Sequence, residues 1–448
     1  MLSELIFNAT PPPDQPAIVT RERSTSWRAL QVDAQRMIQE HQDLGKRRIG
    51  LQFRAPAASY AILAALDRLN SDVFLFDETL SRDEVDRLAE KFRLGVVLTG
   101  SSHDGAELEK RELAGEDAWS GNSTITILTS GSTGEPKAAR HTWGSLGRPV
   151  RKGTDQSTPK WLLTYRPNLY AGLQVMLQCF ADHGTLVIPS GELDPASVSE
   201  LMYTSGVQFV SATPSYWRRL LMFGNSELLK KVPLVQITLG GEVVDQSILD
   251  KLRQRFPKAR VVHLYATTEL GRCFSVSDGM AGFPASYLDH RLPDRVELRI
   301  EANELLARSQ NAMRMYDPHS IEQASMKDWF ATGDLVEVRE NRVYFVGRKT
   351  DMINVAGSKV HPVEVECVIR DIPGVSDVRV FAKSSSISGE LVACEVVPLP
   401  GQDPETLRDT IIRICRTKLA SSQRPRLIRL VTQIGLSPAG KTLRGKVS

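Results

Sequence analysis

The sequence has few cysteines, little net charge and no long apolar run. Its five cysteines are far apart and form no CxxC pair, which argues against a disulfide framework or a zinc site and is typical of a reducing cytoplasm. No apolar run reaches about 18 residues, so we expect neither a transmembrane helix nor a membrane partner. The 56 Lys and Arg nearly balance the 53 Asp and Glu, which argues against a chain that acts mainly by binding nucleic acid.

The first residues, MLSELIFNATPPPDQP, have neither the basic region nor the apolar region of a secretory signal. The eight histidines show no HExxH or HxxxH spacing, so no metal-binding helix is predicted from them. A chain of 448 residues with 41% hydrophobic residues has the size and composition of about two to four globular domains. We therefore expect a soluble, cytoplasmic, multidomain protein.

Short apolar runs alternate with helical patterns over the first two thirds of the chain. Apolar residues at helical spacing predict helices at residues 25–44 and 57–69. The apolar runs that predict strands lie at 49–53, 73–76, 96–98, 162–164, 185–188, 208–210, 234–239 and 260–264. Strands that alternate with helices predict an α/β fold with parallel-rich sheets.

The pattern changes in the last third of the chain. Short alternating segments at 296–300, 304–307 and 342–346 predict a small β subdomain. Strands near 377–382 and 391–397 and a helix at 404–419 then predict a small α+β unit. We therefore predict an N-terminal domain over residues 1–347 and a C-terminal domain over residues 348–448.

The C-terminal segment 401–448 is basic, with ten Lys and Arg, three acids and a net charge of +7. Two interpretations remain open. The charges could form a solvated face, or they could dock an anionic partner such as a phosphorylated cofactor or an acidic carrier protein.

The segment TSGSTGEPK, at residues 129–137, follows a strand-like run and has the composition of an anion-binding loop. Gly131 and Gly134 allow a tight turn in which backbone N–H groups point inward. The side chains that would add donors or positive charge are Thr129, Ser130, Ser132, Thr133 and Lys137. The segment is not a Walker A loop, because Pro136 stands where the second glycine belongs. It predicts a polyphosphate site, with a flexible surface turn as the alternative.

Five further motifs follow this loop in order: LGGE at 239–242, LYATTE at 264–269, TGD at 332–334, GRKTDMINVAGSKVHPVEVE at 347–366 and SPAGKTLRGK at 437–446. Together they resemble the motifs of the adenylate-forming (AMP-binding) superfamily, which includes acyl-CoA synthetases, peptide-synthetase adenylation domains and luciferase. The resemblance spans residues 120–448. Residues 1–119 fit only in outline and are shortened.

The resemblance implies an acid–thiol ligase that uses ATP and Mg²⁺. A carboxylic acid would be activated to acyl-AMP with release of pyrophosphate, and the acyl group would then pass to the thiol of CoA or of a carrier protein's phosphopantetheine. Lys441 matches the catalytic lysine of the first step, in which its ammonium would stabilise charge between the carboxylate and the α-phosphate. Because Lys441 lies well past the 347–351 hinge, it would act only when a mobile C-terminal domain closes.

The resemblance also implies roles for other residues. Glu269 would be catalytic as the magnesium ligand, Thr268 would bind the α-phosphate, and Gly357 and Lys359 would belong to the loop that lines the thiol tunnel. The implied nucleotide contacts are Gly240, Gly241, Glu242 and Tyr265 for adenine and Asp334 and Arg348 for ribose. The implied acyl pocket contains Tyr170, Gly172, Ser211 and Ala212, a mixture that suits an aryl or short acyl group. Aromatics at helical spacing are also common in cores, so a structural role is the alternative.

Four positions depart from the family pattern. Ala266 replaces the glycine of Y-G-x-T-E, Trp143 and Leu169 stand where many members have histidines, and Thr350 occupies the hinge. His141, near Trp143, is out of register with the family histidine. None of these changes removes the phosphate loop, Glu269, Asp334 or Lys441, so we expect the chemistry to be retained.

Three other functions are compared with a CoA ligase: a carrier-protein ligase, a non-catalytic nucleotide-binding protein and a phosphotransferase. A stand-alone ligase that loads a carrier protein would have the same motifs as a CoA ligase. A non-catalytic nucleotide-binding homologue is disfavoured because Lys441 and Glu269 are both present. A phosphotransferase is disfavoured by the absence of Walker A and kinase signatures.

Overall fold

The computed structural model describes residues 1–12, 14–102, 106–114, 117–129, 136–153, 158–189, 194–317, 329–385 and 389–435. None of the helices in these residues combines the length and the apolar character that a membrane span requires. The helices are α1 (Leu2–Phe7), α2 (Trp27–Glu40), α3 (Pro56–Arg68), α4 (Arg82–Lys91), α5 (Trp143–Gly147), α6 (Tyr170–Ala181), α7 (Pro195–Ser205), α8 (Pro214–Phe223), α9 (Ser226–Lys231), α10 (Gln246–Arg255), α11 (Pro362–Arg370) and α12 (Pro404–Lys418).

The longest sheet has the strand order β14-β13-β12-β11-β9-β10-β1-β2. Its inner strands are parallel, and the edge strands β14 and β2 pair antiparallel with their neighbours. The strands are β14 (Gly271–Val276), β13 (Arg260–Thr267), β12 (Gln236–Leu239), β11 (Phe209–Ala212), β9 (Lys160–Leu163), β10 (Thr185–Val187), β1 (Pro16–Val19) and β2 (Ser24–Ser26). The parallel core of this sheet confirms the predicted α/β class.

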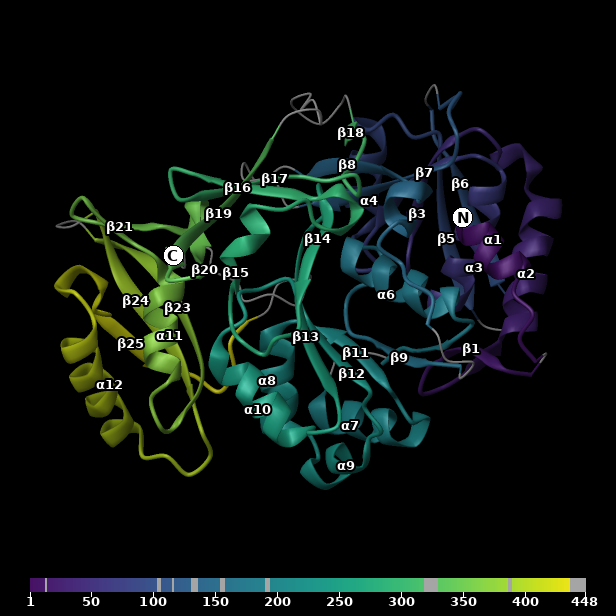
Figure 1. Cartoon of the computed structure of the whole chain (residues 1–448). Coiled ribbons are helices and arrows are strands. Elements are labelled where there is room, and N and C mark those ends of the chain that lie inside the picture. Colours follow the sequence, from purple (N-terminus) through teal and green to yellow (C-terminus); the bar gives the residue numbers. More distant parts are fainter. Residues whose placement is uncertain are drawn as a thin grey trace.

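A second sheet has the order β18-β8-β7-β4-β3-β5-β6. The strands are β18 (Met315–Tyr316), β8 (Lys137–Thr142), β7 (Thr124–Thr129), β4 (Asp72–Phe76), β3 (Arg48–Gln52), β5 (Val96–Ser102) and β6 (Ala106–Glu112). From β7 to β5 the strands are parallel, whereas β8, β18 and β6 are antiparallel additions at the two edges. Figure 1 shows this sheet at the end of the molecule that carries the N-terminus.

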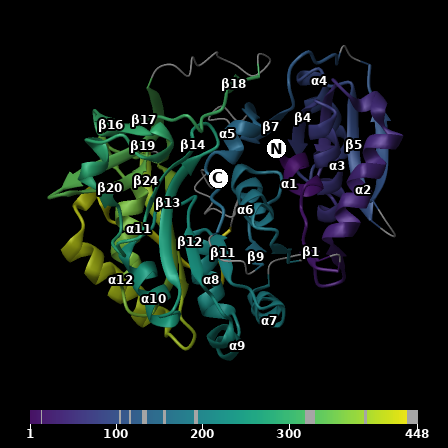
Figure 2. The same ribbon diagram turned by 45° about the vertical axis from the view of Figure 1, so that its right-hand side comes forward.

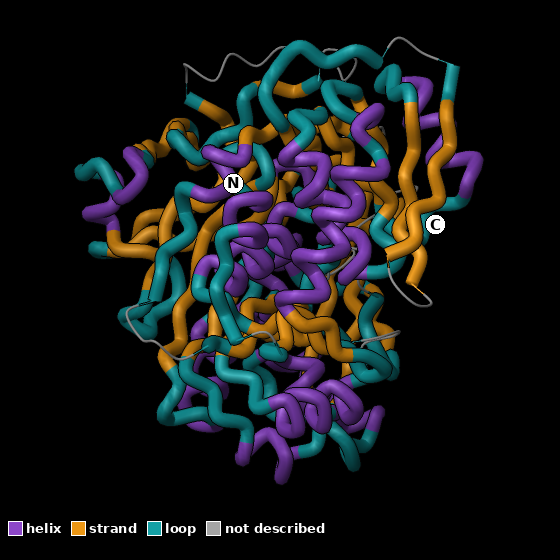
Figure 3. Tube along the Cα trace, turned by 90° about the vertical axis from the view of Figure 1, so that its right-hand side faces the viewer, coloured by secondary structure: helices purple, strands orange, loops and turns teal. Residues whose placement is uncertain are grey.

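Helices fill the space between the two large sheets, as the tube view in Figure 3 shows. The helix α3 is buried on almost every side because its sequence is rich in Ala, Leu and Ile. Its one buried acid, Asp67, accepts hydrogen bonds from Ser3 and from the N-terminal ammonium. Together with α6, α1 and α2, this helix forms the largest hydrophobic core.

Two smaller sheets complete the fold. The antiparallel sheet β15-β20-β19-β17-β16 is the predicted β subdomain, with strands β15 (Phe283–Pro284), β20 (Arg342–Arg348), β19 (Phe330–Arg339), β17 (Glu304–Arg308) and β16 (Glu297–Glu301). The last sheet has the order β22-β21-β24-β23, with β25 paired to β24. Its strands are β22 (Ser358–Val360), β21 (Ile353–Val355), β24 (Gly389–Pro398), β23 (Val375–Ser385) and β25 (Leu427–Leu430).

The last sheet packs with α11 and α12 around a hydrophobic core of its own. It forms a separate small C-terminal domain, which lies beside α8 and α10 of the large domain (Figure 1). Figure 2 shows the same domain from a second direction, again flanking the β13 side of the longest sheet.

Candidate active site

The candidate site lies around the carboxyl end of β13. In a parallel sheet, ligands bind at the carboxyl ends of the strands, because loops from neighbouring strands meet there. The chain turns sharply after Thr267 and returns as the antiparallel β14. Gly271 makes the turn possible, since its φ of +70° is in the left-handed region and a Cβ there would lie 2.7 Å from Asn311.

Tyr265, Asp334 and Arg348 converge beside this turn. The Tyr265 hydroxyl donates to Oδ2 of Asp334 at 2.6 Å, and Nε of Arg348 donates to Oδ1 at 2.8 Å. The ladder between β19 and β20 places Asp334 opposite Arg348. Burial would lower the pKa of Arg348, but the Asp334 carboxylate raises it above its ordinary value overall. The structure thus brings together three residues from separate motifs, with Tyr265 69 positions before Asp334 and Arg348 14 positions after it.

The ring of Tyr265 already has aromatic neighbours. It stacks against Phe274 with ring centroids 5.4 Å apart and against Phe345 at 5.0 Å. Burial, with the Asp334 carboxylate beside it, raises the pKa of Tyr265 well above its ordinary value. The hydroxyl therefore stays protonated and orients Asp334. The adenine contact of Tyr265 stays a prediction.

The LGGE segment follows β12, next to β13 in the same sheet. Gly240 donates its N–H to the Ala212 carbonyl, and Gly241 has a φ of +86°, which favours glycine. The Glu242 carboxylate accepts a hydrogen bond from the Ser215 N–H at 3.0 Å, in the first turn of α8. The side chain of Glu242 therefore has a structural contact in addition to its predicted place near adenine.

The phosphate loop connects two paired strands. Thr129 ends β7, Lys137 begins β8, and the two residues are partners in the antiparallel ladder. The two ends of the predicted phosphate loop therefore lie side by side in one sheet. The predicted residues Ser130, Gly131, Ser132, Thr133 and Gly134 lie outside the described residues.

Thr268 and Glu269 form the tip of the β13–β14 hairpin. The Thr268 carbonyl lies 2.6 Å from Nε2 of His141, and the Glu269 carbonyl accepts from the Met313 N–H at 2.7 Å. The described residues contain no group of three or more His, Cys, Asp or Glu that could hold a metal. A single carboxylate fits Mg²⁺, because this ion is commonly held by one or two carboxylates together with substrate phosphates and water.

The residues of the predicted acyl pocket are close-packed. Tyr170 is 6% exposed and its hydroxyl accepts from the Arg272 N–H, while Ala212 is fully buried. A Cβ at Gly172 would lie 2.1 Å from the Arg166 carbonyl, so the backbone itself requires glycine there. Ser211 lies on β11 and its carbonyl accepts from the Thr164 hydroxyl. Each residue thus has a structural contact, and the acyl-binding role stays a prediction.

Three of the positions that depart from the family pattern differ in their surroundings. The indole N–H of Trp143 donates to Ser123 at 3.0 Å, and the side chain is buried. Leu169 precedes α6 without a side-chain cap. Thr350 lies in an exposed turn, where its hydroxyl donates to Asp351 at 3.1 Å.

The predicted thiol-acceptor loop is the exposed turn between β21 and β22. Ala356 and Gly357 both have positive φ, at +49° and +88°, which is the geometry of a tight two-residue hairpin turn. A Cβ at Gly357 would have no atom within 4 Å, and Lys359 is exposed. Lys441 lies outside the described residues.

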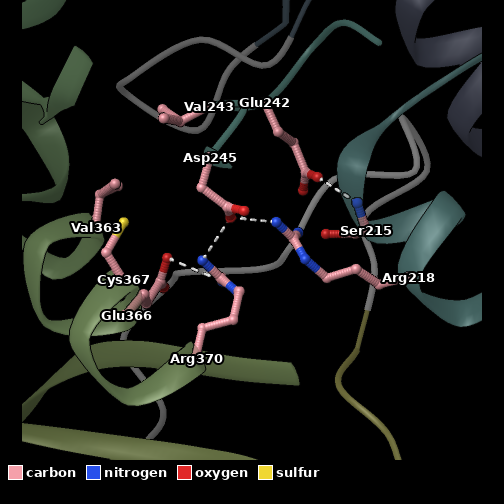
Figure 4. A pocket seen from close by; sticks show the side chains of 9 residues that line it. All are labelled: Ser215, Arg218, Glu242, Val243, Asp245, Val363, Glu366, Cys367 and Arg370. Atoms are coloured by element: carbon pink, nitrogen blue, oxygen red, sulfur yellow. Dashed lines mark hydrogen bonds and ion pairs between the residues drawn. The ribbon is translucent and has the colours of Figure 1, made fainter. Parts of the chain in front are cut away.

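A charged pocket lies between the two domains, and no sequence motif predicted it. Asp245, at the start of α10, accepts from Arg218 of α8 and from Arg370 of α11, the latter at 3.2 Å. Figure 4 shows both guanidinium groups pointing at this carboxylate across the pocket. Burial would raise the pKa of Asp245, but the two arginines hold it below its ordinary value. Asp245 therefore links the large domain to the small one.

Two family matches cover most of the chain. Residues 107–316 match the AMP-binding enzyme family, and residues 364–441 match the AMP-binding enzyme C-terminal domain. The chain belongs to the AMP-binding enzyme family. This confirms the predicted adenylate-forming superfamily and the predicted enzyme class, an AMP-forming acid–thiol ligase.

Relatives of this AMP-binding enzyme match along most of its length. A 2-succinylbenzoate–CoA ligase of Listeria monocytogenes is 23% identical, over 97% of this chain and 96% of that protein. A feruloyl-CoA synthase of an Amycolatopsis species is 26% identical, over 72% of this chain and 69% of that protein. The crystal structure of an anthranilate CoA ligase with anthranoyl-AMP covers 98% of this chain and 95% of its own at 18% identity, with a TM-score of 0.80. The structural likeness confirms the fold.

Proposed function

We propose that this enzyme activates an aromatic carboxylic acid with ATP and transfers the acyl group to CoA. The observation that carries the nucleotide part is the convergence of Tyr265, Asp334 and Arg348 at the end of β13. An ordered carboxylate at this edge can accept hydrogen bonds from both ribose hydroxyls, as the family resemblance implies. The phosphate loop begins and ends in the neighbouring sheet at Thr129 and Lys137.

The first step joins the acid to the α-phosphate. A carboxylate oxygen attacks the α-phosphorus, the bond to the β-phosphate oxygen breaks, and pyrophosphate leaves. Both reactants are anions, so the enzyme must align them and offset their repulsion. Lys441 would place its ammonium between the carboxylate and the α-phosphate. Glu269 would hold Mg²⁺, which when bound neutralises phosphate charge.

The second step transfers the acyl group. The thiolate of CoA attacks the acyl carbonyl, and AMP leaves as the carbon–oxygen bond to its phosphate breaks. We propose that the domains divide at residues 347 and 348, and that the small domain rotates there between the two steps. The exposed turn at Gly357 would then reach the thiol tunnel, with Lys359 beside it. A cytoplasmic location, where CoA and reduced thiols coexist, fits this proposal.

The aromatic substrate is supported by three of the relatives, because 2-succinylbenzoate, ferulate and anthranilate are all aromatic acids. Another relative is named for a long-chain fatty acid, so an aliphatic acid is the alternative. CoA as the acceptor has the same support. A carrier protein is the alternative, based on the net charge of +7 in residues 401–448. At least one of those charges has an internal use, because the Arg424 guanidinium donates to the carbonyls of Leu419 and Arg416 at the end of α12.

Pyrophosphate exchange into ATP across a library of acids tests the first step. We expect aromatic acids to support exchange and saturated aliphatic acids to support it poorly. Exchange with aliphatic acids alone would overturn the aromatic assignment, and no exchange with any acid would overturn the proposed adenylation activity.

The Lys441→Ala variant tests the division of labour between the half-reactions. We expect it to lose exchange by a factor of about 100 or more and to keep thioester formation from supplied acyl-AMP. Lys418→Ala is the matched control, because Lys418 is an exposed lysine at the end of α12 and should keep both activities. An equal loss in both half-reactions of Lys441→Ala would contradict the assigned role.

The acceptor is decided by comparing free CoA with a holo carrier protein in the same transfer assay. Saturable transfer to micromolar CoA is the expected result. Transfer to the carrier alone would replace CoA by a carrier protein.

A further inference from the structure

His141 is a buried histidine that links the phosphate-loop strand to the tip of the β13–β14 hairpin. It lies on β8, four residues after Lys137, and its side chain is fully buried. Nε2 lies 2.6 Å from the Thr268 carbonyl oxygen, and Nδ1 lies 3.1 Å from the Ser145 hydroxyl. The ring also packs against Tyr170, with centroids 5.8 Å apart.

The partners of His141 define its tautomer. A carbonyl oxygen can only accept, so Nε2 must carry the proton. Burial lowers the pKa of His141 to about 4, so at neutral pH the ring is uncharged and Nδ1, which faces the Ser145 hydroxyl, carries no proton. His141 is therefore a directed hydrogen-bond donor that carries no charge.

The bond that His141 makes is to a specific peptide. The Thr268 carbonyl belongs to the planar peptide group that joins Thr268 to Glu269. The direction of this carbonyl sets the backbone angles on either side of the peptide, and with them the directions of both side chains. The family resemblance assigns these two side chains to the α-phosphate and to Mg²⁺.

The hairpin tip has a second attachment to the same strand. The Glu269 carbonyl accepts from Met313, and the next residue, Arg314, donates to the carbonyl of Arg140 on β8. The tip is thus held to β8 directly through His141 and indirectly through the segment that leads into β18. Because β8 begins at Lys137, where the predicted phosphate loop ends, both attachments connect the hairpin tip to the strand that follows this loop.

We infer that His141 is a positioning residue for adenylation. It holds the Thr268–Glu269 peptide in the orientation that directs both side chains toward phosphates bound by the loop between β7 and β8. This inference rests on the proposed function. Without the donor, the Thr268 carbonyl would lose its partner, and the peptide would be free to rotate toward another one.

Two substitutions separate donation from packing. His141→Leu introduces an apolar side chain of similar size that has no hydrogen-bond donor. His141→Gln retains an N–H that can reach the Thr268 carbonyl. We expect the leucine variant to lose kcat for pyrophosphate exchange by about 10- to 100-fold, the effect of a misplacement near 1 Å. The KM for the acid should change little, and the glutamine variant should recover most of the lost kcat.

His263 provides the matched control. It is also a buried histidine whose Nε2 faces a carbonyl, that of Met280 at 3.0 Å, but this bond lies away from the hairpin tip. His263→Leu should therefore lower stability without a comparable loss of kcat. Equal losses in His141→Leu and His263→Leu, or in His141→Leu and His141→Gln, would overturn the inference.

A second variant and a binding assay test the role of His141 if the leucine variant does not fold or the enzyme shows no exchange. If His141→Leu does not fold, His141→Asn replaces it. The asparagine side chain is shorter, so its amide can hydrogen-bond near Ser145 but does not reach the Thr268 carbonyl. Binding of Mg²⁺ with a non-hydrolysable ATP analogue is then measured for wild type and variants. We expect the donor-free variant to need about 10-fold more Mg²⁺, a shift of the size that loss of a supporting contact causes at metal sites, and an unchanged Mg²⁺ requirement would overturn the role. This binding assay needs no carboxylic acid substrate. If the wild type shows no pyrophosphate exchange, the proposed function is refuted, but the Mg²⁺ measurement still tests the role of His141.

Discussion

Two clusters of arginine and aspartate join parts of this molecule, one inside the large domain and one between the domains. In the first, Arg48 and Arg140 share Asp72 and Asp317, with both carboxylates fully buried. The Thr124 hydroxyl donates to Asp72 as well. The positive and negative charges are equal in number, and the strands β3, β4 and β8 that carry three of them belong to one sheet.

The second cluster has the same chemistry but a different setting. Asp245 pairs with Arg218 in the large domain and with Arg370 in the small one. Its side chain is 15% exposed, and it lines an open pocket (Figure 4). Glu366 and Asp377 lie 3.9 Å and 3.6 Å from Arg370 and offer it alternative partners on the small domain.

Burial within one domain makes an ion pair permanent, whereas a position between two domains makes it reversible. Charges that are fully buried within one sheet can separate only if the sheet opens, so they persist as long as the fold does. Charges that face each other across a domain boundary can separate and become hydrated, and Arg370 keeps acidic neighbours when they do. The first cluster therefore fixes the strand β8, which follows the predicted phosphate loop, and the second holds one arrangement of the two domains.

The largest effect is expected inside the sheet. Asp72→Asn keeps the side-chain shape but leaves two buried arginines with one carboxylate, and this should lower the free energy of unfolding by about 3–5 kcal/mol. Urea denaturation followed by circular dichroism measures the change. Glu227→Gln is the control, because its pair with Lys230 is exposed and exposed ion pairs contribute little to stability. A loss for Asp72→Asn no larger than that of the control would show that the buried cluster is not a permanent joint.

A second effect concerns the neighbouring residue on β8. His141 has a pKa near 4 in the folded state and about 6.5 when unfolded. Below about pH 6.5 only the unfolded chain gains this proton, so folding stability falls as the pH drops, by about 2 kcal/mol at pH 5 and about 3 kcal/mol at pH 4. The full contribution is present above about pH 6.5.

The measurement compares the pH dependence of unfolding in wild type and in His141→Gln. Burial also lowers the pKa of His263, which adds a slope of the same sign, but His263 is common to both proteins. The glutamine variant should lose only the part due to His141. Parallel curves from pH 7 to pH 5 would show that His141 takes up its proton in the folded state as easily as in the unfolded chain.

The sequence predicts the inner strands well and the edges poorly. The β4 residues Asp72–Phe76 are all buried, and a buried parallel strand is a continuous apolar run that local patterns detect. The edge strand β6 reads AELEKRE and β8 reads KAARHT, and neither resembles a strand. In β8 the charged and polar side chains of Arg140 and His141 are nonetheless buried, because partners elsewhere in the chain satisfy them.

The same limit applies to the candidate site. Tyr265, Asp334 and Arg348 could be named because each belongs to a short motif. His141 lies 127 residues from Thr268, and Arg370 lies 125 residues from Asp245. Such contacts depend on how distant segments pack, which no local spacing records.

The smallest effect on stability, and a distinct effect on activity, is expected between the domains. Asp245 also accepts from the Ile248 N–H and caps α10, and asparagine caps a helix equally well. Asp245→Asn therefore removes the charge that holds Arg370 while it keeps the cap. Arg218 and Arg370 both line the pocket between the domains, so both become accessible to water when the small domain moves away. The free energy of unfolding should therefore fall less than in Asp72→Asn.

The activity of Asp245→Asn should change in one half-reaction. The turn at Gly357 is exposed in this arrangement of the domains, so we expect the arrangement to serve adenylation, and its loss should reduce pyrophosphate exchange about 2- to 10-fold, equivalent to about 0.4–1.4 kcal/mol. Thioester formation from supplied acyl-AMP should be unchanged or faster, because rotation away from Asp245 becomes easier. The ratio of the two rates, measured on one enzyme preparation, cancels differences in active fraction. A fall in thioester formation with unchanged exchange would mean that the contact serves the second step, and an unchanged ratio would mean that the Asp245 contact with Arg370 does not control the domain arrangement.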